Sequence, residues 1–98
     1  MRESRYQADV IKALRDEFPG CVILKNDANY IQGIPDLTIL YGPRWAMLEV
    51  KTSEEEAFRP NQEYYIDHLN GMGFAAVIFP GNEGAVFRAL QHALSADG

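Results

Sequence analysis

Two apolar runs that flank a Gly-Pro pair limit the fold of this chain more than any other feature of its sequence. The first run ends at Tyr41 and the second begins at Arg44, with Gly42 and Pro43 between them. Apolar runs rich in β-branched residues and separated by a turn-forming pair are typical of a β-hairpin. A two-residue turn at this pair would place Tyr41 opposite Arg44.

The few charged residues of this hairpin fall at the ends of its strands. The same pairing places Asp36 opposite Glu49, with Cβ atoms about 4.5–5.5 Å apart, although another loop length would shift this register. Lys51 would share a face with Glu49, about 7 Å further along the strand, because side chains alternate between faces. Two carboxylates this close repel each other unless a cation lies between them. Mg²⁺ suits such a place, since it takes a few carboxylate oxygens and keeps several waters.

Each of these residues also has a purely structural interpretation. Asp36 would be a turn or strand-start residue after a proline, and Glu49 would form a simple ion pair with Lys51. The metal interpretation is stronger for Glu49, because its neighbours Leu48 and Val50 are expected to be buried. A carboxylate on a buried strand is costly unless it is paired or bound to a metal.

The motifs around these residues resemble those of a known nuclease superfamily. Pro-Asp followed by Glu-x-Lys is the pattern of the PD-(D/E)xK nucleases. The chain is more specifically similar to the virus-type replication-repair nuclease (VRR-NUC) family, from about residue 3 to about residue 79, through Gly33-x-Pro35-Asp36-Leu37, Glu49-Val50-Lys51-Thr52 and Gln62. The resemblance implies a restriction-endonuclease-like core: one α/β domain over residues 1–98, with a mixed β-sheet flanked by helices.

The resemblance also implies a metal-dependent active site. One or two Mg²⁺ or Mn²⁺ ions would bind Asp36, Glu49 and the Val50 carbonyl. Lys51 would stabilise developing negative charge or position the attacking water. Gln62 would hydrogen-bond a metal-bound water or orient Lys51.

An acidic residue on the first helix completes the metal site in that family, and Glu3 is the candidate here. A capping box formed by Ser4 and Gln7 is an alternative, and it would leave Glu3 just outside the helix. The structural interpretation of Glu3 is a solvated acid near the positive end of the helix dipole.

The whole chain predicts elements in the order α-β-β-β-α-β-α. Apolar periodicity and turn residues predict helices at residues 2–18, 60–71 and from 81 or 82 onward, and strands at 21–25 and 74–79 in addition to the hairpin. The strand at 74–79 is apolar throughout, so we expect it to be central and covered on both faces. Residues 95–98 are expected to fray.

The second helix is expected to begin at Pro60, because proline suits the first helical position. Gln62 would open its apolar stripe and look toward the sheet. The other members of the stripe are Tyr65, Ile66, Leu69, Met72 and Gly73.

The charge balance constrains any nucleic-acid partner. The net charge of −5 at pH 7 is unusual for a nucleic-acid binder, since such proteins present a basic surface. Metal ions would offset part of this charge, and the glutamates at 54–56 would point away from the DNA. Lys25, Asn26 and Tyr30 are candidates to contact the DNA backbone and Arg59 to meet a phosphate, with a connecting or solvated role as the alternative for each.

The remaining composition favours a small intracellular protein. The single cysteine, Cys21, is expected to be a small core residue rather than a nucleophile, in a reducing compartment. No run approaches the length of a membrane span, so we expect a soluble, cytoplasmic protein of a bacterial or phage-infected host cell. A chain of 98 residues buries a limited core, which favours a dimer.

These features predict a Mg²⁺- or Mn²⁺-dependent endonuclease that hydrolyses phosphodiester bonds in DNA. No sequence-reading module is recognisable, so we expect it to select DNA by structure. Compact stand-alone members of the resembled family are similar to dimeric enzymes that act on branched DNA such as four-way (Holliday) junctions, and the resemblance implies a homodimer here. A non-catalytic DNA-binding or assembly module of the same fold is one alternative. An unrelated interaction domain with surface acids is another.

Overall fold

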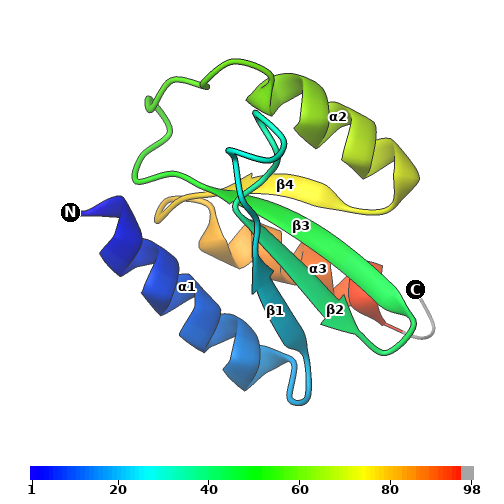
Figure 1. Cartoon of the computed structure of the whole chain (residues 1–98). Coiled ribbons are helices and arrows are strands. Elements are labelled where there is room, and N and C mark those ends of the chain that lie inside the picture. Colours follow the sequence, from blue (N-terminus) through cyan, green and yellow to red (C-terminus); the bar gives the residue numbers. More distant parts are fainter. Residues whose placement is uncertain (96–98) are drawn as a thin grey trace.

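The expected order of elements is confirmed by the computed structural model, which describes residues 1–95 (Figure 1). The elements are α1 (Glu3–Glu17), β1 (Val22–Lys25), β2 (Leu37–Tyr41), β3 (Arg44–Val50), α2 (Gln62–Met72), β4 (Ala75–Ile78) and α3 (Glu83–Leu94). The fraying expected at residues 95–98 lies outside the described residues, apart from Ser95.

The described strands form one mixed sheet in the order β1-β2-β3-β4. β1 and β3 are antiparallel to β2, and β4 is parallel to β3. The predicted hairpin register is confirmed, because Tyr41 pairs with Arg44 and the ladder runs on to Leu37 and Leu48. Gly42 has a φ of +58°, a left-handed conformation that glycine adopts without a Cβ clash, and this allows the tight turn.

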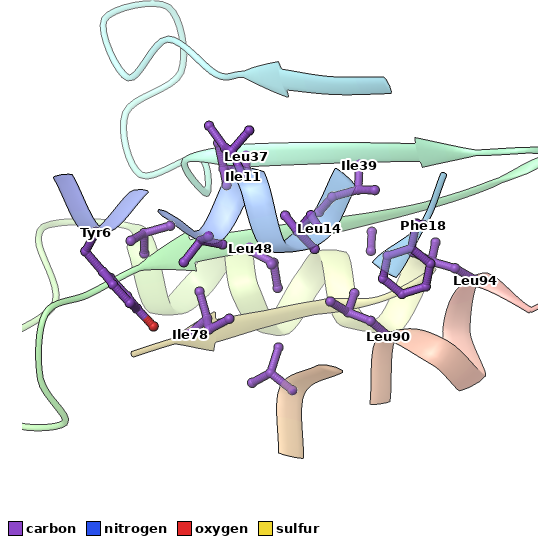
Figure 2. Close-up of a cluster of buried hydrophobic side chains, with 14 residues drawn as sticks. Tyr6, Ile11, Leu14, Phe18, Leu37, Ile39, Leu48, Ile78, Leu90 and Leu94 are labelled. Carbon is purple, nitrogen blue, oxygen red and sulfur yellow. The ribbon is translucent and has the colours of Figure 1, made fainter. Parts of the chain in front are cut away.

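The hydrophobic core lies on the face of the sheet that α1 and α3 cover (Figures 1 and 2). The four-residue spacing on α1 gives a buried stripe of Tyr6, Val10, Leu14 and Phe18. The core also contains Ile11, Leu37, Ile39, Ala46, Leu48, Val50, Ile78, Val86, Leu90 and Leu94. The Tyr6 hydroxyl donates to Glu83 Oε2 at 2.5 Å, which joins the start of α1 to the start of α3.

Helix α2 lies over the opposite face of the sheet and begins two residues later than expected (Figure 2). Asn61 adopts a left-handed φ of 71°, so a turn from Arg59 precedes the helix and Pro60 is not its first residue. The prediction for Gln62 is confirmed, since it is the buried residue of α2 and faces the sheet. Met72 was expected in the apolar stripe, but it is 65% exposed because it lies at the last turn, beyond the cover of the sheet.

Strand β4 was expected to be central, but it lies at one edge of the described sheet. Its apolar sequence has another physical cause, because α2 and α3 both pack on β4 and cover its two faces. Cys21 packs against the core, as expected for a small buried residue. Among residues 1–95, the helices are too short or too polar to cross a lipid bilayer.

Candidate active site

The candidate site lies where β2 begins and β3 ends. The register of the hairpin, continued by one pair beyond Leu37 and Leu48, brings Asp36 beside Glu49. Asp36 Oδ2 accepts a hydrogen bond of 2.8 Å from the backbone N–H of Val50. The two carboxylates are therefore neighbours, as the hairpin pattern predicts.

Asn26 fixes the approach of the chain to Asp36. Its backbone N–H donates to the carbonyl of Asp36 at 2.8 Å, and its side-chain Nδ2 donates to the carbonyl of Pro35 and to Thr38 Oγ1, each at 2.9 Å. The sequence suggested Asn26 as a DNA contact. In the structure its amide is instead used inside the protein, where it holds the Pro35–Asp36 segment in place.

Glu49, Lys51 and Gln62 form a buried polar network. Gln62 Nε2 donates to Glu49 Oε2 at 2.9 Å, while Lys51 Nζ donates to Gln62 Oε1 at 2.8 Å. Lys51 Nζ also lies 3.6 Å from Glu49 Oε2. These side chains come from β3, the residue after β3 and the first turn of α2, so the fold of this region orients all three.

The other carboxylate oxygen of Glu49 is the clearest sign of a cation site. Glu49 is 2% exposed, and its Oε1 has no hydrogen-bond donor within the described part of the chain. Burial raises the pKa of Glu49 to about 8, the nearby Asp36 carboxyl and Glu3 raise it as well, and Lys51 lowers it. A cation between Asp36 and Glu49 would relieve this repulsion and supply the missing partner of Oε1.

The donor set fits a hard divalent metal such as Mg²⁺. Among residues 1–95, no three His, Cys, Asp or Glu side chains converge on one ligand position. Mg²⁺ does not require three, since it is often bound by one or two carboxylates and keeps several waters. Asp36 and Glu49 would hold the ion.

Glu3 lies on the same side of the molecule as the two carboxylates. It is the first residue of α1 and is half-buried, so the capping box that would leave it outside the helix is not formed. Burial raises the pKa of Glu3, and the negative charges of Asp36 and Glu56 raise it further, whereas Arg59 lowers it. Glu3 is thus close enough to Asp36 for the Asp36 charge to raise its pKa.

Glu56 is the residue of this region that the sequence did not single out. The glutamates at 54–56 were expected to point away from the site, but Glu56 Oε2 lies 3.7 Å from Lys51 Nζ. The backbone N–H and Oγ1 of Thr52 both donate to Glu56 Oε1, at 2.8 and 2.9 Å. A hydroxyl residue four positions before a glutamate is the only sequence signal for this turn, and it is a weak one.

The other candidate DNA-contacting residues lie on the surface. Tyr30 is 85% exposed, and Lys25 and Arg59 are also exposed. Lys25 lines a cavity of about 400 Å³ between α1 and β1, together with Lys12 and Arg15. Asp16 also lines this cavity, so its lining has three positive side chains and one negative side chain.

A larger cavity of about 690 Å³ lies at the opposite end of β3, beside the turn of the hairpin. It is lined by Trp45, Met72, Phe74 and His92, among others, and by none of the candidate site residues. We assign it no part in the chemistry.

The architecture is that of an α/β protein, with a four-stranded mixed sheet flanked by helices. This fold is similar to that of a solved structure, Archaeoglobus fulgidus Hjc, a Holliday junction resolvase from an archaeal hyperthermophile. The TM-score is 0.54 at 18% sequence identity, and the match covers 78% of this chain and 67% of the resolvase. No protein-family model and no curated protein sequence matches the chain.

Proposed function

We propose that this chain is a Mg²⁺- or Mn²⁺-dependent, structure-selective DNA endonuclease related to the VRR-NUC group of PD-(D/E)xK nucleases. The observation that carries the proposal is the buried network of Glu49, Lys51 and Gln62 beside Asp36, with Glu49 Oε1 lacking a donor among residues 1–95. A buried carboxylate with an open coordination position is costly in a purely structural role.

The proposed chemistry assigns a task to each side chain. Asp36, Glu49 and the Val50 carbonyl would hold the metal, with Glu3 as an additional candidate ligand or a nearby charge. A metal held there would supply polarisation of the phosphodiester and a lower pKa for the attacking water. Lys51 stabilises the negative charge that develops on the phosphate.

Gln62 keeps Lys51 and Glu49 in their relative positions, since it donates to one and accepts from the other. Hydrolysis would leave a 5′-phosphate and a 3′-hydroxyl, as the resembled nucleases generally do.

Branched DNA is the proposed substrate, with four-way junctions as the first choice. The support is the fold, which is similar to that of a protein described as a Holliday junction resolvase. The exposed Lys25, Arg59 and Tyr30 are proposed to contact the DNA. The cavity that Lys25 shares with Lys12 and Arg15 supplies the positive charge that phosphate binding needs.

A homodimer is part of the proposal, because a two-fold dimer presents two sites to symmetry-related strands. Val22, Leu24 and Leu40 are 53%, 46% and 39% exposed on neighbouring strands, and they provide apolar surface that a second copy would cover. Size-exclusion chromatography with light scattering tests this directly. A strict monomer, even with DNA bound, would contradict it.

The competing candidate is a non-catalytic DNA-binding or assembly module of the same fold. The observation that favours it is the burial of Lys51, which is only 3% exposed. Such a module would bind DNA and leave it intact with every metal.

A cleavage assay separates the two candidates. Matched linear, flapped and four-way-junction DNAs are incubated with Mg²⁺, Mn²⁺ or EDTA, beside the Asp36→Asn variant. The proposal expects metal-dependent cutting of the junction that the variant loses. If only the linear and flapped DNAs are cut, the nuclease assignment stands and the preference for four-way junctions is excluded. If nothing is cut at low salt with either metal, the result supports the non-catalytic binding module.

A further inference from the structure

Four acceptor oxygens of the protein surround the ammonium of Lys51. The ammonium donates to Gln62 Oε1 at 2.8 Å and to the carbonyl of Ala57 at 3.2 Å. Two carboxylate oxygens, Glu49 Oε2 and Glu56 Oε2, lie 3.6 and 3.7 Å from the ammonium. Lys51 is 3% exposed, and these four acceptors surround its ammonium, so a substrate phosphate must replace one of them before Lys51 can act on it.

Two of these partners belong to the segment 52–57, which connects β3 to α2. Glu49 and Gln62 are held by β3 and α2, and each also contacts the other, so they stay with Lys51. The Ala57 carbonyl and Glu56 come from a connection without regular secondary structure. The connecting segment is therefore the part that a phosphate would displace.

Glu56 is oriented for this contact by its own turn. Thr52 holds Glu56 Oε1 through two hydrogen bonds, which leaves Oε2 facing Lys51. The carboxylate therefore lies beside the ammonium with the charge and oxygen chemistry of a phosphate. The start of α1 lies on the same side of the molecule as this segment (Figure 1), and Glu3 adds a like charge next to Glu56. Glu56 Oε2 is 3.7 Å from Lys51 Nζ, which is beyond hydrogen-bond distance, so a phosphate oxygen that hydrogen-bonds to the ammonium can take its place.

We propose that Glu56 is a specificity-determining residue that occupies Lys51 until a DNA phosphate displaces it. This inference rests on the proposed nuclease function and adds a reason for its selectivity. A DNA that makes many other contacts, such as a branched DNA, displaces Glu56 readily. A linear duplex makes fewer contacts and remains a poor substrate, because the carboxylate competes with its phosphate.

The test compares Glu56→Gln with Glu55→Gln. Glutamine at 56 keeps an oxygen for Thr52 and removes the charge that competes with phosphate. Glu55 is an exposed neighbour of the same type, so its variant changes the net charge equally without touching Lys51. In Glu56→Gln, at DNA concentrations that saturate binding of the junction but not of linear DNA, cleavage and binding of linear DNA should increase up to about fivefold relative to the junction. Glu55→Gln should leave that ratio unchanged.

A second measurement does not depend on cleavage. Acylation of Lys51 by a lysine-directed reagent, followed by mass spectrometry, reports how freely the ammonium is released from its partners. Glu56→Gln should be labelled at Lys51 several-fold faster than the wild type, and Glu55→Gln should be labelled at the wild-type rate.

Two results would overturn the inference. One is unchanged labelling of Lys51 in Glu56→Gln. The other is an equal loss of cleavage on linear and branched DNA, which would make Glu56 a support of the active conformation. If the wild type cleaves nothing, the proposed function fails by itself, and the labelling and DNA-binding comparisons still decide the role of Glu56.

Discussion

Lys51 Nζ and Glu49 Oε2 lie 3.6 Å apart inside this protein, with side chains that are 3% and 2% exposed. Gln62 bridges the two groups, and the second oxygen of Glu49 has no donor among residues 1–95. Buried ion pairs contribute little net stability, because desolvation offsets their attraction. A buried Lys–Glu pair beside a second carboxylate is better explained by a role in the proposed active site than by a contribution to folding stability.

The raised pKa of Glu49 predicts how stability changes with pH in the absence of metal. The pKa of about 8 in the folded protein is above the ordinary value of 4.5, so the folded state binds more protons between these limits. Stability should therefore decrease as pH rises from about 4.5 to about 8, by a few kcal/mol at most, since one pKa unit is worth about 1.4 kcal/mol. Thermal melts in EDTA measure this. Glu49→Gln should flatten the profile, and an equally steep decline in that variant would contradict the assignment.

Divalent metal should stabilise the protein, and more strongly at high pH. Metal binding requires ionised carboxylates, so the raised pKa of Glu49 makes protons compete with the ion. At a metal concentration of 100 times Kd the gain is about 2.7 kcal/mol. Melting with Mg²⁺ or Mn²⁺ at pH 6 and pH 8.5 should show the larger shift at pH 8.5. Asp36→Asn should lose the shift, and the same shift in the variant would exclude Asp36 as a ligand.

Removing Lys51 should destabilise the protein as well as inactivate it. Lys51→Met keeps most of the side-chain volume. At pH 9, above the pKa of about 8 for Glu49, it leaves the ionised Glu49 without its cation, and breaking a buried pair in this way costs about 3–5 kcal/mol. The double variant Lys51→Met/Glu49→Gln should recover much of that loss. Urea unfolding of the three variants gives the coupling energy. Additive losses in the double variant would show that the two residues do not interact.

Gly33→Ala should disturb the candidate active site indirectly, by displacing Asn61 and the adjacent Gln62. Gly33 has a φ of +93°, and an added Cβ would lie 2.5 Å from Asn61 Cβ, next to Gln62. Gly20→Ala is a matched control, because Gly20 has a φ of +89° and nothing within 4 Å of an added Cβ. The control should cost about 1–2 kcal/mol for its left-handed backbone. Gly33→Ala should cost more and reduce cleavage, and equal effects would show that the contact with Asn61 is unimportant.

Lys25 should contribute one phosphate contact to DNA binding. For each such contact, the slope of log Kobs against log salt changes by about 0.9. Lys25→Ala should weaken binding to all DNAs and reduce the slope by about that amount. Arg88→Ala, which removes an exposed charge on α3, is the control. If Lys25→Ala leaves the salt dependence of binding unchanged, Lys25 does not contact a DNA phosphate.

Patterns that depend on neighbouring residues were predicted well from this sequence. The hairpin register follows from the turn at Gly42, and that register alone brings Asp36 to Glu49. The position of Gln62 follows from helical periodicity, even though the start of its helix was placed two residues too early. The turn that precedes this helix is hard to predict, because it combines a left-handed φ at Asn61 with a close approach to Gly33, which is distant in the sequence.

Features that depend on tertiary contacts were not predictable in the same way. β4 is as apolar as a central strand because two helices cover it, and composition does not distinguish that case from a central position. Glu56 looked like a solvated acid, since its neighbours Glu54 and Glu55 are exposed. Its place beside Lys51 depends on the path of an irregular connection, for which the sequence contains no periodic signal.

Metal-dependent cleavage of branched DNA through Asp36 is tested most directly by a single-turnover cleavage assay on an immobile four-way junction. Wild type and Asp36→Asn are compared with Mg²⁺, with Mn²⁺ and with EDTA, and the products are then treated with DNA ligase. We predict that the wild type makes paired, metal-dependent nicks and that the variant makes none. Ligase should reseal the nicks, because hydrolysis leaves a 5′-phosphate and a 3′-hydroxyl. Equal cutting by Asp36→Asn, or a wild type that binds the junction without cutting it in either metal, would contradict this prediction.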